Sequence, residues 1–65
     1  MYAVLDNEEI NLRAEERGLD RAALAQAAGI SVDTLKRIQR GERVMFGTAQ
    51  KVARVFGVRA RELRA

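Results

Sequence analysis

Apolar side chains recur at helical spacing in several short segments of this chain, and three of these segments begin with the same local pattern. In each case a residue that can cap a helix has one apolar residue directly before it and another four positions after it. Such an apolar pair forms a hydrophobic staple, which fixes the path of the chain as it enters a helix. The capping residues are Asp6, Asp20 and Ser31, and Glu9 completes a capping box with Asp6. The sequence therefore predicts helices that begin at these three residues.

Glycines mark the ends of the predicted helices, because glycine readily adopts the left-handed conformation that closes a helix. Gly18 follows the first helix and Gly41 follows the third. Thr48 is the predicted cap of a fourth helix, whose apolar residues keep helical spacing as far as Gly57. The pattern thus predicts short helices that are joined by tight turns.

The two ends of the chain give weaker signals. A short fifth helix is predicted over residues 59–64, where Val58 and Leu63 form a staple-like pair without a good cap residue. Residues 2–5 have extended character, and no other segment shows a strand signature. A chain of 65 residues forms one domain at most. We therefore expect an all-α fold, a compact five-helix bundle in which residues 1–65 form a single domain.

Residues 21–40 contain the second and third predicted helices, with a turn between them. Two helices that cross at a wide angle need a small residue where they approach and a glycine in the turn. Ala25 and Gly29 meet these needs at the right separation. The side chains that the second of the two helices turns outward are polar, except for Val32. Residues 21–40 are therefore predicted to form a helix-turn-helix. An exposed second helix of this kind fits the major groove of DNA.

A family resemblance is carried by the stretch GLDRAALAQAAGISVDTLKRIQRG, which is similar to the helix-turn-helix of the phage Cro and repressor (XRE-type) family. The stretch that follows, GERVMFGTAQKVARVFGV, resembles the next helix of that family, so the resemblance covers roughly residues 7–63. It implies a lambda-repressor-like domain that binds double-stranded DNA through its third helix, about residues 31–40. The implied function is that of a bacterial or phage transcriptional regulator that represses by blocking its operator.

The resemblance also implies roles for single residues of the third helix. The positions that usually meet bases hold Val32, Asp33 and Arg37, and Lys36 lies beside them. An arginine fork satisfies O6 and N7 of guanine together, a valine packs on a thymine methyl, and a carboxylate accepts from a cytosine amino group. The alternative for Asp33 is action by exclusion, since its carboxylate repels phosphate. The alternative for Arg37 is a surface ion pair with Asp33, one turn earlier in the helix.

Phosphate contacts are implied for residues at the ends of the two motif helices and in the loop after them. Backbone amides at a helix start, hydroxyl groups and guanidinium groups all donate to phosphate oxygens. The residues at these positions are Arg21, Ser31, Thr34, Arg40 and Arg43.

Charge is divided unevenly along the chain and favours an anionic partner. Residues 1–20 hold six acidic side chains against two basic ones, whereas residues 21–65 hold ten basic side chains against three acidic ones. The second part therefore carries a net charge of +7, which suits nucleic acid. The alternative is a solvated basic surface, and charge alone does not decide between the two.

Composition excludes several other classes of function. With neither cysteine nor histidine, the chain cannot build the common zinc sites, and it has no thiol nucleophile and no imidazole base. We therefore expect no enzyme activity, no metal, no cofactor and no small-molecule ligand. The N-terminus lacks the features of a signal peptide, and no apolar run approaches the ~20 residues of a membrane span. We expect a cytoplasmic protein, and the short helices between glycine turns disfavour a membrane-surface helix.

A dimer is an attractive expectation, because one recognition helix reads only a few base pairs and a two-fold dimer reads two half-sites about one DNA turn apart. We predict a weak or DNA-induced homodimer, with Phe46 in the core and the contact made by apolar residues at Val44, Met45, Val58 and Leu63. The alternative function is a protein-interaction module on the same fold, such as an antitoxin or an assembly subunit. The outward arginines of the third helix and the loop after it favour DNA.

Overall fold

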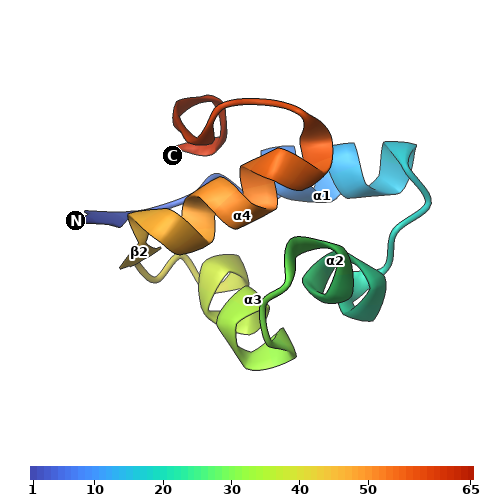
Figure 1. The fold of residues 1–65 in the computed structure, drawn as a ribbon, viewed down its shortest axis with the longest axis horizontal. Coiled ribbons are helices and arrows are strands. Elements are labelled where there is room, and N and C mark those ends of the chain that lie inside the picture. Colours follow the sequence, from blue (N-terminus) through green and yellow to red (C-terminus); the bar gives the residue numbers. More distant parts are fainter.

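The computed structural model describes all 65 residues as four α-helices, one short 3-10 helix and a two-stranded antiparallel sheet (Figure 1). In chain order the elements are β1 (Tyr2–Ala3), α1 (Asn7–Glu16), α2 (Arg21–Ala28), α3 (Val32–Gln39), β2 (Val44–Met45), α4 (Phe46–Phe56) and the 3-10 helix η1 (Ala60–Leu63). The fold is mostly helical, as predicted. No helix has the length and apolar character that crossing a membrane requires.

The first three helices begin where the capping pattern predicts. The side chain of Asp6 accepts from two backbone N–H groups of α1, that of Asp20 accepts from Ala23 N at 2.8 Å, and that of Ser31 accepts from Thr34 N at 3.0 Å. Each cap satisfies a donor that the helix itself leaves without a partner, so these starts are fixed by local sequence.

The capping box predicted for α1 is wrong. Glu9 does not return to the Asp6 backbone, because its carboxylate binds Arg13 Nε at 2.7 Å instead. The Asp6 N–H donates to Leu63 O at 2.6 Å, so a residue from the far end of the chain takes the place of the Glu9 side chain.

The hydrophobic core surrounds α4, which crosses the middle of the molecule with α2 and α3 on one side and the C-terminal segment on the other (Figure 1). The core holds 16 buried residues and no buried polar or charged residue. Helix α4 packs most extensively against η1 and α2, and it also contacts β1 and β2. The largest side chains that are removed from solvent almost completely are Ile10, Leu35, Ile38, Leu63 and Val52.

The prediction of five α-helices is wrong at the C-terminal end of the chain, whereas the extended start expected at residues 2–5 contains strand β1. The segment predicted as the fifth helix is a 3-10 helix of four residues, and the two-stranded sheet was not predicted. In that sheet Tyr2 pairs with Met45 and Ala3 with Val44. The C-terminus lies beside the same segment, since Ala65 N donates to Val4 O at 2.9 Å. The extended start of the chain is therefore held between two segments that lie far away in sequence.

The start of α4 is also corrected. Thr48 is not its cap, because the helix begins at Phe46 and its N-cap, Met45, makes no side-chain capping bond. The first free donor of the helix, Phe46 N, binds the carbonyl oxygen of Met1 at 2.9 Å. The strand pairing thus brings a backbone acceptor to the helix start, and this carbonyl oxygen replaces a capping side chain. Phe46 itself is half-buried and packs against the core.

Candidate nucleic-acid interface

The turn between α2 and α3 has the features of a helix-turn-helix. Gly29 ends α2 with φ of 73° and ψ of 33°, and Ile30 N donates to Ala25 O at 3.0 Å across the turn. Ala25 is 2% exposed, which lets the two helices approach closely. From α3, Leu35 and Ile38 point inward and are fully buried. This packing fixes α3 to the domain by one face and leaves the opposite face open.

The open face of α3 carries the four residues that are predicted to meet bases. Asp33, Lys36 and Arg37 are exposed, and Val32 is 38% exposed. Residues three and four positions apart share one side of a helix, so these side chains form a single outward surface.

Arg37 has no carboxylate partner in the structure. The molecule has two ion pairs, Glu9 with Arg13 and Arg40 with Glu42, and neither involves Asp33 or Arg37. The surface ion pair that was the alternative for Arg37 is therefore not formed. Its guanidinium group keeps its N–H donors for a ligand.

The residues predicted to meet phosphate lie around this surface. Arg21 is exposed at the first position of α2, and Arg43 is exposed in the loop directly before β2. Arg40 caps the C-terminal end of α3, and its Nε donates to Glu42 Oε2 at 2.7 Å. Both side chains of that pair are largely exposed, at 62% and 49%, so the pair is a weak one that a phosphate can replace.

Ser31 and Thr34 differ in whether their hydroxyl group can still donate a hydrogen bond to phosphate. The Ser31 hydroxyl accepts from Thr34 N at 3.0 Å and donates to Thr34 Oγ1 at 2.9 Å, so its proton is committed to the cap. Thr34 accepts that bond, and its own hydroxyl proton stays free. Of the two hydroxyl groups, that of Thr34 is the available donor.

Tyr2 lies in this region as well, which the sequence did not predict. The antiparallel sheet brings β1 beside the loop that ends in Arg43, and the guanidinium carbon of Arg43 lies 5.1 Å from the centroid of the Tyr2 ring. The only sequence signal was the extended character of residues 2–5, which does not name a pairing partner. Two residues of β2 are too few to show a strand pattern.

The apolar residues predicted to form a dimer contact divide into two groups. Val44 is 7% exposed and Leu63 is fully buried, so the prediction is wrong for these two residues. Val44 faces the core from the sheet, and Leu63 packs from η1. Met45 is 61% exposed on the outer face of the sheet, and Val58 is half-buried.

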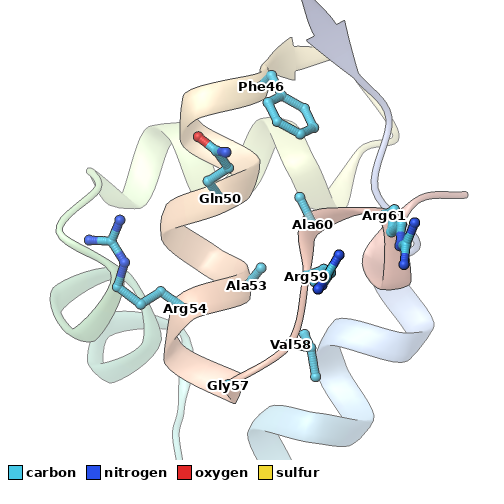
Figure 2. A pocket seen from close by; sticks show the side chains of 9 residues that line it. All are labelled: Phe46, Gln50, Ala53, Arg54, Gly57, Val58, Arg59, Ala60 and Arg61. Atoms are coloured by element: carbon cyan, nitrogen blue, oxygen red, sulfur yellow. The ribbon is translucent and has the colours of Figure 1, made fainter.

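Val58 lies at the largest hollow of the molecule, which is separate from the α3 surface. This hollow of about 510 Å³ lies between α4 and the segment that leads into η1 (Figure 2). That segment lies on the side of α4 away from α3 (Figure 1). Its apolar floor includes Phe46, Ala53 and Ala60 (Figure 2). The side chain of Arg54 extends to the other side of α4, whereas Arg59 lies over the segment itself (Figure 2).

A helix-turn-helix whose second helix turns an open, partly basic face to solvent defines a DNA-binding domain of the helix-turn-helix class. A family model described as "Helix-turn-helix" matches residues 10–63 of the chain. The chain therefore belongs to the XRE-type helix-turn-helix family, a family of DNA-binding domains. Neither a curated protein nor a solved structure matches it.

Proposed function

We propose that the protein is a sequence-specific regulator of transcription that inserts α3 into the major groove of double-stranded DNA. The observation that carries this proposal is the outward face of α3, where Arg37 is exposed and has no carboxylate partner. An α-helix fits the major groove, and the base edges there present a donor and acceptor pattern that differs for each base pair.

Arg37 is the principal reader of this surface. Its free guanidinium donates to O6 and N7 of one guanine, a contact that contributes about 1–3 kcal/mol of discrimination. Val32 and Asp33 lie at the start of the same face, where a valine meets a thymine methyl and a carboxylate meets a cytosine amino group. Lys36 lies next to Arg37 in the helix and reaches a base or the backbone.

Phosphate contacts at both ends of α3 hold the helix in register. Arg21 binds one strand from the start of α2, and Thr34, Arg40 and Arg43 bind from the α3 side. Because the Ser31 hydroxyl is committed to capping, the phosphate contact at this position comes from the backbone N–H groups at the start of α3. Each neutralised phosphate releases counterions, so binding weakens steeply as salt rises.

Two copies of the chain bind one operator and repress by covering the promoter. Met45 and Val58 are the dimer candidates that remain accessible. A two-fold arrangement places two α3 helices about one turn of DNA apart.

Selection from a randomised duplex library at about 100 mM salt tests the proposal, with Arg37→Ala beside the wild type and Arg61→Ala as the control for loss of one positive charge. We expect a motif with two half-sites for the wild type and for Arg61→Ala. Arg37→Ala should lose its preference at one guanine in each half-site. If the wild type recovers no motif, base reading is wrong, and the protein-interaction alternative takes its place.

A further inference from the structure

A second hollow lies beside α3, between this helix and the two-stranded sheet. Its volume is about 260 Å³, and its lining includes Tyr2 of β1, Thr34 and Arg37 of α3, Arg43, and Thr48 of α4. Four separate segments of the chain thus meet there. The strand pairing of Tyr2 with Met45 is what brings the first of them to the site.

Tyr2 and Arg43 form the wall of this hollow. The Arg43 guanidinium lies over the ring of Tyr2, with 5.1 Å between the guanidinium carbon and the ring centroid. The attraction between the cation and the ring limits the rotamers of a long side chain that is otherwise free. Arg43 takes part in neither ion pair, so the contact with the ring leaves its N–H donors for a ligand. Tyr2 is 60% exposed and contributes little to the core.

The groups that line the hollow suit a single anionic oxygen group. Arg43 lacks a carboxylate partner, and no acidic side chain lines the hollow. Arg37 also lines it, and its positive charge favours an anion there while its donors meet the guanine. The Thr34 hydroxyl has a free proton, and Thr48 adds a second hydroxyl. Guanidinium and hydroxyl donors that line one hollow without an acid are typical of a site for a phosphodiester.

We propose that this hollow binds a backbone phosphate of the DNA on which α3 sits, and that Tyr2 positions Arg43 for that contact. The inference rests on the proposed function, since α3 must lie in the groove for the phosphate to reach the hollow. The two-stranded sheet is then part of the DNA-binding surface, and the interface extends from the helix-turn-helix to the first residues of the chain.

Binding titrations of labelled duplex by fluorescence anisotropy, at several salt concentrations from about 50 to 300 mM, test the inference. The variants are Arg43→Ala, Tyr2→Leu, which removes the aromatic face but keeps an apolar side chain, and Tyr2→Phe, which keeps the ring. Arg61→Ala is the matched control, because it removes an equal charge on the far side of α4 (Figures 1 and 2). Thermal unfolding of each variant shows that the fold is kept.

The loss of one phosphate contact lowers the steepness of log Kd against log salt by about 0.9 and weakens binding about tenfold near 100 mM salt. We expect this of Arg43→Ala, equally on the selected site and on random duplex, and not of Arg61→Ala. Tyr2→Leu should weaken binding about two- to fivefold, the range given by an exposed cation–π contact. Tyr2→Phe should match the wild type. In the Arg43→Ala background, Tyr2→Leu should have no further effect.

Two results overturn the inference while the proposed function stands: Arg43→Ala behaves like Arg61→Ala on a site that still depends on Arg37, or Tyr2→Leu has its full effect without Arg43. A wild-type protein that binds neither selected nor random duplex near 50 mM salt overturns the proposed function, and the inference with it.

Discussion

Replacing Gly29 by alanine tests whether the backbone conformation of the turn holds α2 and α3 together. Gly29 has a φ of 73°, in the left-handed region, and an added Cβ would meet no heavy atom within 4 Å. Gly47 provides the matched control. It lies in α4 without a positive φ, and an added Cβ there would also meet nothing within 4 Å. The two substitutions therefore differ in backbone conformation and not in crowding.

The magnitudes follow from this difference. A residue with a Cβ in the left-handed conformation costs about 1–2 kcal/mol. Alanine also restricts the unfolded chain more than glycine does, which raises the free energy of unfolding by about 0.4–1 kcal/mol. Gly29→Ala should therefore destabilise the fold by about 1 kcal/mol, and Gly47→Ala should stabilise it by about 0.5–1 kcal/mol. For a domain of this size, 1 kcal/mol moves the Tm by about 4–8 °C.

Urea and thermal unfolding, followed by far-ultraviolet circular dichroism, measure both changes. The two variants should lie on opposite sides of the wild type in Tm and in urea midpoint. If Gly29→Ala is as stable as the wild type, the turn does not require the left-handed conformation. If Gly47→Ala loses as much stability as Gly29→Ala, crowding or lost flexibility accounts for both changes, and the reasoning from φ fails.

Three further substitutions test other parts of the structure. Leu35→Ala removes a fully buried side chain and should destabilise the fold by about 2–5 kcal/mol in urea unfolding, a large part of the stability of a small domain. A near-neutral result would mean that α3 is not packed as described. Arg17→Ala removes a hydrogen bond of 3.1 Å to Phe56 O and a contact with the Phe56 ring at 5.2 Å, and should cost about 1 kcal/mol. Glu42→Gln releases Arg40 from its ion pair and removes a charge that repels DNA, so duplex affinity should rise about two- to fivefold in anisotropy titrations; a fall would show that the pair positions Arg40 for DNA.

Sequence was sufficient where a short stretch of chain sets its own structure. The starts of α1, α2 and α3 follow from capping side chains within three residues of the amides they bind. The end of α2 follows from Gly29, and the small residue Ala25 marks where α3 approaches. These are local rules, so the helix-turn-helix could be predicted without knowledge of the rest of the fold.

Sequence was insufficient where distant segments supply the partner. The start of α4 depends on the Met1 carbonyl, and the Asp6 N–H binds Leu63 O in place of the expected Glu9 side chain. The same long-range contacts bury Val44 and Leu63, which the sequence pattern placed on the surface as dimer residues. A strand of two residues gives too short a pattern to identify its partner.

The candidate site also has features that the sequence could predict and features that it could not. The outward residues of α3 could be predicted, because helical spacing and the buried pair Leu35 and Ile38 settle which face is open. The absence of an ion pair between Asp33 and Arg37 could not, since one-turn spacing permits the pair without requiring it. The position of Tyr2 next to Arg43 also needed the tertiary structure.

Base reading by α3 is tested most directly by single replacements of guanine with 7-deazaguanine, which lacks the N7 acceptor, throughout the selected site. Affinities are compared for the wild type and Arg37→Ala. At one guanine of each half-site the wild type should lose about two- to twelvefold in affinity, about half of a bidentate contact, whereas Arg37→Ala should lose nothing there. Equal losses for both proteins at every guanine, or no loss at any guanine for the wild type, would contradict the placement of Arg37 and α3 against the base edges.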